Sequence, residues 1–410
     1  MKNLLTIVGI SLLLLSCRSY EEKSIRQTVI VYISGENNLV SNISADLAEM
    51  AEGSKQLSDD EKLIAFVDGY GLPYIIEFNN GKRDTIMRYD QDFYASDPEM
   101  FYDIIRKIES QYPTTNNNYA LVLWGHGDGW VVKDSVASSA KARGQRRAYG
   151  QDVGYDIKPS QGEKWMNITQ MARVLERLPR FRYIMADCCC FITVENAYEL
   201  RNVTDFLIGS PAETPNLGAP YHLIMRGLFG KTEGFYQDIV DNYFDYYANL
   251  FKTSAQIKSE FPYVVGHSLP LAVVDLRQNH MEDLAMATRN VLKEPDSYAT
   301  DSIAYFIAND LPLSYDAKSI MKRNLSSDAF QGWEQALNAA IPYKKFSGKW
   351  MTIYRRLYNA FSFDQFKYDE ENFGGIGMHI PSSAYKSNPS YNNGIKNFGW
   401  YQAVGWNRFE

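Results

Sequence analysis

Three consecutive cysteines are the first candidates for chemistry in this chain. An apolar run beginning at Tyr183 leads into Asp187, Cys188, Cys189 and Cys190. Because side chains alternate between the two faces of a strand, continued extension would place Asp187 and Cys189 on one face and the other two cysteines on the opposite face. A cysteine at a strand end can serve as a nucleophile. Taken alone, the triplet is more simply interpreted as three small buried side chains, because free cysteine is among the most buried residue types.

A helix is expected to begin shortly after the cysteines, near Ile192 or Thr193. The free N–H groups at its start would favour the thiolate form of Cys189 and so lower the pKa of its thiol. A nearby histidine would favour the thiolate further. These features favour Cys189 as the reactive member of the triplet, although the register stays open by one position.

His126 is the candidate partner for this sulfur. It lies between glycines in the segment WGHGDGW, directly after the apolar run 119–124. Flanking glycines allow the backbone to approach a ligand closely. An imidazole at the carboxyl end of a strand can act as a general acid or base. The alternative is a histidine in an ordinary turn, and its local features do not decide between the two.

Strands that alternate with helices are expected to position these residues. One-sided apolar spacing predicts a helix over 98–111, and the aromatic-rich stretch 235–250 is also expected to be helical. Apolar runs predict buried strands at 28–34, 62–68, 74–78, 119–124, 183–186, 206–209, 271–276 and 375–381. The alternation predicts an α/β fold with a mostly parallel sheet between helices. Ligands bind at the carboxyl ends of such strands, where His126 and Cys189 are expected.

A polar segment, 133–162, interrupts this rhythm and is expected to be an exposed loop. It contains the basic run KARGQRR, whose charged residues are Lys141, Arg143, Arg146 and Arg147. Such a run is open to proteolysis after basic residues, or it is simply a solvated run of charge.

The N-terminus has the features of an export signal. Lys2 precedes an apolar stretch, 4–15, that is too short to span a bilayer comfortably. The stretch ends in LLSC, which resembles the lipobox of bacterial lipoproteins and implies that Cys17 is acylated and becomes the mature N-terminus. The acidic pair Glu21 and Glu22 resembles a surface-export tag of some outer-membrane bacteria. The alternative is an ordinary signal peptide with an incidental cysteine.

Composition excludes some classes of function and of site. The net charge is −7, which is not the electrostatic footprint of a nucleic-acid-binding protein. Of the four cysteines, Cys17 is assigned to lipid and the other three are adjacent, so no disulfide framework is expected. The histidines other than His126 have no metal-ligand spacing, and no calcium-loop pattern is present. We therefore expect no cofactor and assign no metal.

The two candidate segments together resemble the clostripain family of cysteine peptidases, which belongs to the caspase-like clan. The shared pattern is a strand followed by His126-Gly127 and a later strand followed by Asp187-x-Cys189. Other segments that resemble the family are ENNL (36–39), RAYGQD (147–152), VENAYELR (194–201), SPAETPNLGAPY (210–221) and GIGMHIP (375–381). The resemblance covers 27–225 well and the rest of the chain thinly.

The resemblance implies a caspase-like αβα sandwich and a role for each matching residue. Cys189 would be the nucleophile and His126 the base, with an oxyanion hole formed by the N–H groups of Gly127 and Cys189. Asp187 would line the primary specificity pocket and bind an Arg or Lys of the substrate. The expected parts are the signal peptide 1–17, a tether 18–26, the catalytic region 27–225 and a C-terminal subdomain 226–410.

Relatives in this family cut themselves between the histidine and cysteine segments, and some depend on calcium. The resemblance therefore implies self-cleavage in the loop 133–162, next to its basic residues. We expect an exported endopeptidase, anchored to the bacterial outer membrane by its lipid, that cuts proteins after Arg or Lys. The alternative is a non-catalytic surface lipoprotein on the same fold, which would bind peptide or glycan through a surface rich in tyrosine, of which the chain has 29.

Overall fold

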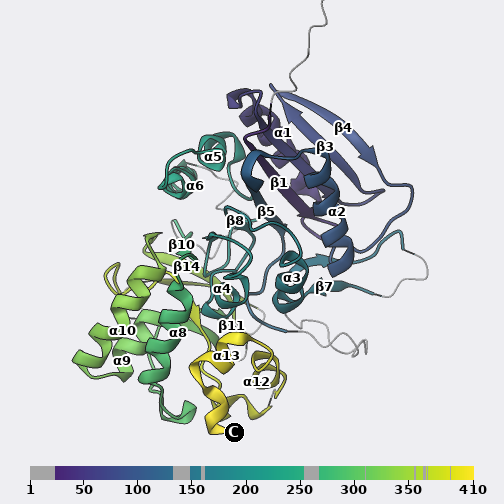
Figure 1. Ribbon diagram of the computed structural model, residues 1–410. Coiled ribbons are helices and arrows are strands. Elements are labelled where there is room, and N and C mark those ends of the chain that lie inside the picture. The colour runs from purple at the N-terminus through teal and green to yellow at the C-terminus, as the bar shows by residue number, and fades with distance from the viewer. Residues whose placement is uncertain are drawn as a thin grey trace, which may run out of the picture.

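A large sheet with helices on both faces forms the centre of the molecule (Figure 1). The computed structural model describes residues 24–132, 148–157, 162–253, 267–309, 311–354, 357–362, 366, 368–387 and 389–410. The described strands of this sheet number nine, in the order β13-β10-β9-β8-β5-β1-β2-β3-β4. No helix in the described part of the chain is long and apolar enough to cross a membrane.

The middle of the sheet is parallel and its two edges are antiparallel. The parallel strands are β1 (Gln27–Ser34), β2 (Glu61–Asp68), β5 (Tyr119–Gly125), β8 (Ile184–Asp187) and β9 (Phe206–Gly209). The antiparallel strands are β3 (Tyr74–Asn79) and β4 (Lys82–Arg88) at one edge and β10 (Leu271–Asp275) and β13 (Tyr343–Lys345) at the other. Every residue of β1, β5, β8 and β9 is buried, which explains why these strands are continuous apolar runs in the sequence.

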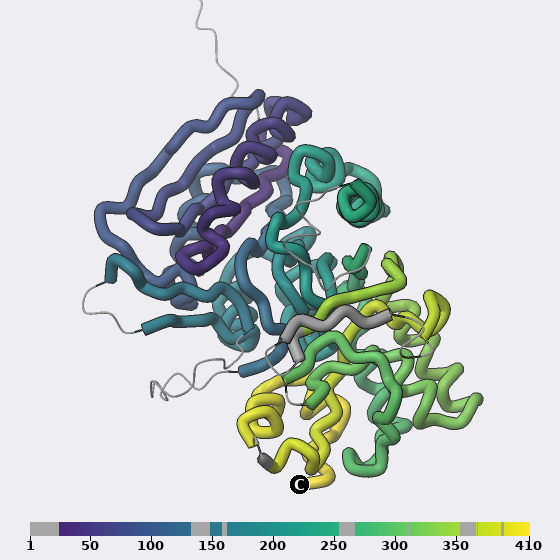
Figure 2. Tube along the Cα trace, turned by 180° about the vertical axis from the view of Figure 1, so that it is seen from behind, coloured from purple at the N-terminus to yellow at the C-terminus, as the bar shows by residue number. Residues whose placement is uncertain are grey.

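Two layers of helices cover the sheet, as a comparison of Figures 1 and 2 shows. One face packs against α1 (Val40–Gly53), α5 (Tyr221–Leu228) and α6 (Phe235–Thr253). The other packs against α2 (Pro98–Gln111), α3 (Ile168–Leu175) and α4 (Val194–Leu200). The αβα sandwich and the helices predicted at 98–111 and 235–250 are confirmed.

Local sequence explains where the helices next to the candidate site begin. The side chain of Asp97 accepts hydrogen bonds from the first amides of α2, and Pro98 takes the first helical position, where its missing N–H costs nothing. Thr193 caps α4 by accepting a hydrogen bond from the Asn196 amide at 3.2 Å. The helix predicted to begin near residue 192 or 193 is therefore confirmed.

The C-terminal part adds a smaller sheet, a hairpin and further helices. Its strands are β11 (Tyr305–Ala308), β12 (Pro312–Asp316), β14 (Lys349–Tyr354), β15 (Leu357–Ser362) and β16 (Gly377–Met378). Its helices are α8 (His280–Asn290), α9 (Ala317–Asn324), α10 (Ser327–Ala340), α12 (Pro389–Ile395) and α13 (Gly399–Val404). Short 3₁₀ helices lie at Ser54–Gln56, Thr115–Asn117, Pro295–Ser297, Ser383–Ser387 and Trp406–Phe409. Because β10 and β13 pair with the central sheet, that sheet continues across the boundary expected at residue 225, which falls inside α5.

The segment expected to be an exposed loop, 133–162, is in part a strand. β6 (Tyr149–Asp152) pairs with β7 (Lys164–Met166), and Tyr149 is fully buried, with its hydroxyl donating to the Tyr32 carbonyl at 3.1 Å. The loop prediction is therefore wrong for these four residues, because one large aromatic anchors an otherwise polar stretch. Residues 133–147 and 158–161 lie outside the described residues.

Candidate active site

His126 and Cys189 lie at the ends of neighbouring parallel strands. β5 and β8 pair in a register that places Trp124 opposite Asp187, and His126 and Cys189 each follow two residues later. A Cβ atom added to Gly127 would lie 2.5 Å from the Cys189 carbonyl oxygen, so the two segments are in close contact beyond the strand ends. The fold therefore brings the two predicted catalytic residues to the same edge of the sheet.

Burial separates the three cysteines. Cys188 is 2% exposed and Cys190 is 1% exposed, and both pack in the core between the sheet and the layer of α2, α3 and α4. Cys189 is only half-buried. Cys190 adopts a left-handed backbone conformation (φ 58°), which turns the chain toward α4. Cys189 is thus the member of the triplet that solvent and a substrate can reach.

The sulfur of Cys189 is held by the loop that follows β9. The Thr214 amide donates to Sγ at 3.3 Å, and the Thr214 hydroxyl lies 3.5 Å from the same atom. Burial and the charge of Glu213 raise the pKa of the Cys189 thiol well above its usual value, against the hydrogen bonds from Thr214, which lower it. The expected low pKa is therefore wrong for this state of the protein. Burial and the charge of Glu213 are the main causes, and α4 begins only at Val194, five residues after Cys189.

The His126 ring is in the state that a general base requires. Its Nε2 lies 2.6 Å from Oδ1 of Asn38, an amide oxygen that can only accept a hydrogen bond. Nε2 therefore carries the hydrogen, and Nδ1 keeps the lone pair that takes up a proton. Burial lowers the pKa of His126 to about 4, so the imidazole is neutral near pH 7. Sequence reasoning noticed the ENNL segment but did not identify Asn38 as the residue that orients the histidine.

Asp187 is buried on the opposite face of the sheet from Cys188 and Cys190. Its carboxylate accepts hydrogen bonds from the Ala219 amide at 3.0 Å, the Tyr221 hydroxyl at 2.8 Å and the Tyr243 hydroxyl at 3.1 Å. Burial raises the pKa of Asp187, and these three hydrogen bonds oppose that rise. Ala219, Tyr221 and Tyr243 belong to the loop after β9, to α5 and to α6, so these three segments surround the carboxylate.

A second buried carboxylate, Asp46 of α1, lies beside Asp187. The Trp124 indole donates to Asp46 Oδ2 at 2.6 Å, and a Cβ atom on Gly218 would lie 3.2 Å from an oxygen of each aspartate. Burial and the charge of Asp187 raise the pKa of Asp46 to about 9. Sequence reasoning missed Asp46 because α1 is distant in the chain and nothing in its local pattern marks the residue. Asp187 and Asp46 thus form a buried pair of acidic side chains.

The remaining predicted site residues fall into two groups. Gly127 lies against Cys188 and Cys189, with a Cβ atom added to it 3.0 Å from the Cys188 sulfur. Cys17 and the basic residues Lys141, Arg143, Arg146 and Arg147 lie outside the described residues. In the described part of the chain, one group of acidic side chains has the spacing of a metal site: Glu36, Asp68 and Asp92.

Solved structures with the same architecture are cysteine proteases. A secreted C11 cysteine protease from Bacteroides thetaiotaomicron, in complex with an irreversible peptide inhibitor, is 27% identical, with a TM-score of 0.75 over 93% of this chain and 99% of that one. An inactive zymogen of a C11 protease from Parabacteroides distasonis shares the fold at 22% identity, with a TM-score of 0.72 over 92% of this chain and 97% of that one. Another solved structure of a secreted C11 cysteine protease from B. thetaiotaomicron does so at 21% identity, with a TM-score of 0.71 over 93% of this chain and 99% of that one.

The family model of the clostripain family matches residues 31–366, which is most of the chain. No curated protein matches the chain. The match includes the strands that carry His126 and Cys189, and the architecture is the caspase-like αβα sandwich of the C11 proteases. The chain therefore belongs to the clostripain family and is a cysteine endopeptidase.

Proposed function

We propose that this peptidase cuts peptide bonds after Arg or Lys, with Cys189 as the nucleophile and His126 as the base. The observation that carries the proposal is the position of the one half-buried cysteine of the triplet. It lies at the ends of paired strands, where its segment contacts the one that carries a neutral imidazole, and it follows the buried Asp187, which lies next to Asp46.

The chemistry follows from this arrangement. His126 takes the proton of the Cys189 thiol, and the sulfur attacks the substrate carbonyl carbon. The N–H groups of Gly127 and Cys189 donate to the oxygen as it gains negative charge. The imidazolium then protonates the leaving amine, so that the carbon–nitrogen bond breaks and a thioester remains. Water, deprotonated by His126, hydrolyses the thioester and releases the thiol.

The basic preference rests on the charge beside the nucleophile. Asp187 and Asp46 are both buried, burial raises the pKa of each, and the charge of Asp187 raises that of Asp46 further. An Arg or Lys side chain entering this site would provide the missing positive charge, and a guanidinium could bind a carboxylate through two hydrogen bonds. A neutral side chain of the same shape would leave both carboxylates uncompensated.

Covalent labelling tests the nucleophile and its register together. A peptidyl chloromethylketone ending in Lys should alkylate the wild-type protein once, at Cys189, as read by mass spectrometry of the digested protein. Cys189→Ala should lose both labelling and peptide hydrolysis. Cys188→Ala is the matched control, because its buried sulfur is out of reach, and it should be labelled like the wild type. Labelling that persists in Cys189→Ala would overturn the assignment.

The specificity is tested with two substrates that differ only in charge. A peptide with Arg before the cut bond should be cleaved with a kcat/KM about 100-fold higher than one with citrulline, the neutral analogue of Arg. Asp187→Ala should remove most of that difference by slowing cleavage of the Arg peptide. If the variant keeps the ratio of the wild type, Asp187 is not the specificity residue.

We also propose self-cleavage in the loop 133–162 at one of the basic residues Lys141, Arg143, Arg146 and Arg147. The support is the basic run itself, which matches the proposed specificity, and the position of the segment between the strands of the two catalytic residues. Active protein should separate into two chains on a denaturing gel, and Cys189→Ala should stay whole. A cut Cys189→Ala chain would assign the cleavage to another protease.

Export and lipid anchoring through Cys17 complete the proposal. The support is the lipobox-like LLSC segment after a short apolar run, together with a solved relative that is described as secreted. In a bacterial host, the wild-type protein should partition into the detergent phase and incorporate labelled palmitate. Cys17→Ala should lose both properties. Palmitate incorporation that is unchanged in Cys17→Ala would overturn this part.

A further inference from the structure

Two exposed tyrosines contact each other at the edge of the sheet where His126 and Cys189 lie. Because β1, β2, β5 and β8 are parallel, their carboxyl ends share this edge. Tyr70 follows the end of β2 by two residues, and Tyr155 follows the end of β6 by three. The two residues are 55% and 67% exposed, and their ring centres lie 5.1 Å apart. Together with Leu72, which is 51% exposed in the same loop as Tyr70, they form what we call the apolar patch.

The apolar patch differs from the other exposed hydrophobic side chains of the described residues. Leu223, Met286, Leu311 and Phe409 are also exposed, but they lie apart, on α5, on α8, before β12 and at the C-terminal end. Exposed apolar residues that are scattered singly are normal on a soluble protein. Apolar residues that lie together beside a candidate active site mark a place where a ligand or partner binds. An occupant of the patch is therefore expected.

Hydrogen bonds connect the patch to the turn that orients His126. The Tyr155 amide donates to Oε1 of Glu36 at 2.6 Å, and the Val153 amide donates to the Glu36 carbonyl at 3.1 Å. Glu36 lies two residues before Asn38, whose side-chain oxygen is 2.6 Å from Nε2 of His126. The backbone around Tyr155 is thus fixed relative to the imidazole, so the patch has a defined position beside the proposed catalytic pair.

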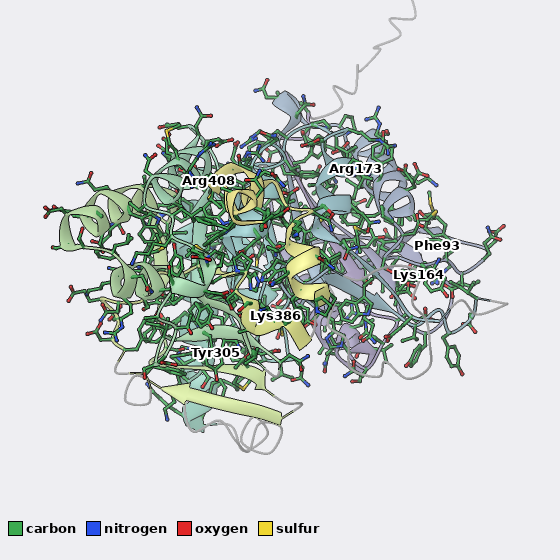
Figure 3. The ribbon with its side chains drawn as sticks, turned by 90° about the horizontal axis from the view of Figure 1, so that it is seen from below. Phe93, Lys164, Arg173, Tyr305, Lys386 and Arg408 are labelled. Carbon is green, nitrogen blue, oxygen red and sulfur yellow. The ribbon has the colours of Figure 1, made fainter. Side chains whose placement is uncertain are left out.

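The segment that carries Tyr155 and the strand β7 pack on one side chain, that of Tyr94. A Cβ atom added to Gly154 would lie 2.6 Å from the Tyr94 hydroxyl oxygen, and Nζ of Lys164 in β7 lies 4.1 Å from the centre of the Tyr94 ring. Figure 3 shows Lys164 on the same side of the molecule as Phe93, the residue before Tyr94. Because this support is already packed, a ligand that binds at the patch pays less for ordering the segment.

The order of the strands gives the direction in which a substrate crosses this edge. From one side to the other, the strands run β9, β8, β5, β1 and β2. Asp187, the proposed ligand of the basic side chain before the cut bond, is contacted by the loop after β9 and by α5 and α6. His126, which protonates the leaving amine in the proposed mechanism, follows β5, on the other side of Cys189. The residues after the cut bond therefore extend toward β1 and β2, past Trp165, whose ring centre lies 6.0 Å from that of His126.

We propose that the apolar patch binds an aliphatic or aromatic side chain of the substrate, roughly two to four residues after the cut bond. Neighbouring strands lie about 4.8 Å apart, so β2 is roughly 10 Å from β5. An extended peptide advances about 3.3 Å per residue, which brings the third residue after the cut bond to the patch. An apolar side chain packed against Tyr70, Leu72 and Tyr155 removes apolar surface of both molecules from water. This subsite rests on the proposed catalytic pair and basic preference, to which it adds a second determinant of specificity.

Peptides that differ at one position test the subsite. Each has Arg before the cut bond, a fluorophore and a quencher at its ends, and a single Leu at one of the other positions, which are otherwise Ser. The wild-type protein should cleave the peptide with Leu at the third position after the bond with a kcat/KM about 10-fold higher than the peptide without Leu. Tyr155→Ser should bring this ratio close to 1, and Tyr155→Phe should keep it, because the ring remains. Because the ratio is taken within each protein, a general loss of activity cancels.

Met286→Ser is the matched control, because Met286 is 62% exposed on α8, and it should keep the ratio of the wild type. Tyr70→Ser is a second variant of the patch, with the same expected loss as Tyr155→Ser. A wild-type protein that does not distinguish Leu from Ser after the cut bond, or a ratio that survives in both tyrosine-to-serine variants, would overturn the subsite. A preference for Leu only before the cut bond would overturn its direction. If no Arg peptide is cut at all, the proposed function fails first and the subsite with it.

Discussion

At the residue scale, burial and the charge of Glu213 favour the protonated form of the proposed nucleophile, Cys189. The Thr214 amide and hydroxyl contact the Cys189 sulfur, and the adjacent Glu213 raises the pKa of the thiol. Glu213 is itself buried, and its amide donates to the Met351 carbonyl of β14 at 3.2 Å. The loop after β9 thus connects the reactive sulfur to the C-terminal hairpin.

Removing the charge of Glu213 should make the sulfur more reactive. Glu213→Gln keeps the shape of the side chain but removes the charge that disfavours the thiolate, so the pKa of Cys189 should fall. Alkylation of Cys189 by iodoacetamide at pH 7 should then be several-fold faster, measured as the rate of mass increase. Glu233→Gln, at an exposed position, is the control and should react like the wild type. An unchanged rate in Glu213→Gln would contradict this role.

The acid limb of activity should reflect the buried imidazole. Because burial lowers the pKa of His126 to about 4, the neutral base persists from pH 7 down to about pH 5 and is lost as the pH falls through 4. The kcat/KM for a basic peptide should therefore stay nearly constant on acidification until below pH 5. A kcat/KM that falls to half its maximum near pH 6.5 would instead show that the His126 imidazole is solvated in the active enzyme.

Sequence reasoning identified the proposed catalytic pair, His126 and Cys189, but not the groups that surround it. His126 and Cys189 follow apolar runs that can be recognised from sequence. Asn38, Asp46 and Glu213 approach the pair only through the fold, from a turn, a helix and a loop with no pattern of their own.

At the element scale, the predictable strands are those buried on both faces. The central parallel strands consist of continuous apolar residues, and each was predicted close to its observed bounds. β6 was missed because YGQD has one aromatic and no apolar run. The predicted late strand at 375–381 is observed only as the two residues of β16, and residues 379–381 have no regular secondary structure.

The contact between the ends of β5 and β8 leaves no space for a side chain. Gly127→Ala would place a methyl group 2.5 Å from the Cys189 carbonyl oxygen, so the two segments would have to separate. We expect labelling of Cys189 by the basic chloromethylketone to slow at least 10-fold, since positioning errors near 1 Å are costly in catalysis. Gly332→Ala on α10 meets no atom within 4 Å and serves as the control, with wild-type labelling and slightly higher stability. Equal labelling of both variants would contradict this prediction.

At the scale of the whole molecule, the catalytic and C-terminal parts share a core. One hydrophobic cluster joins Leu121 of β5 to Trp333 of α10 and to Trp406 near the C-terminus. Gly377 of β16 also donates its amide to the Ile192 carbonyl at 3.0 Å, directly after the cysteines. The sequence could not reveal this sharing, because resemblance to the family is thin beyond residue 225. A substitution in the core of the C-terminal part is therefore expected to alter the conformation of the segment that carries the three cysteines.

His379 should make the stability of this shared core depend on pH. It is fully buried, with Nδ1 2.8 Å from the Leu313 carbonyl oxygen and its ring centre 4.4 Å from that of Trp130, and burial lowers its pKa to about 4. Between pH 6.5 and 4 the unfolded chain takes up a proton at this residue and the folded chain does not. Its contribution to the free energy of unfolding therefore falls by about 3 kcal/mol over that range.

The measurement is urea unfolding of the Cys189→Ala protein at pH 7 and at pH 4.5. His379→Gln removes the titrating group, so the loss of stability between the two pH values should be about 2–3 kcal/mol smaller in the variant. A loss of the same size in both proteins would show that the imidazole does not stay neutral in the fold.

The order of strands in the central sheet decides what a cut in the loop before β6 does to the molecule. β5 lies before that loop in the chain, and its neighbour in the sheet, β8, lies after it. The Gly150 amide of β6, which also lies after the loop, donates to the His126 carbonyl at 2.9 Å. The two products would stay paired through β5 and β8 and could not dissociate without unfolding. Polypeptides 1–147 and 148–410, expressed from separate genes in one cell, should therefore associate and restore peptide hydrolysis. Neither polypeptide should be active alone.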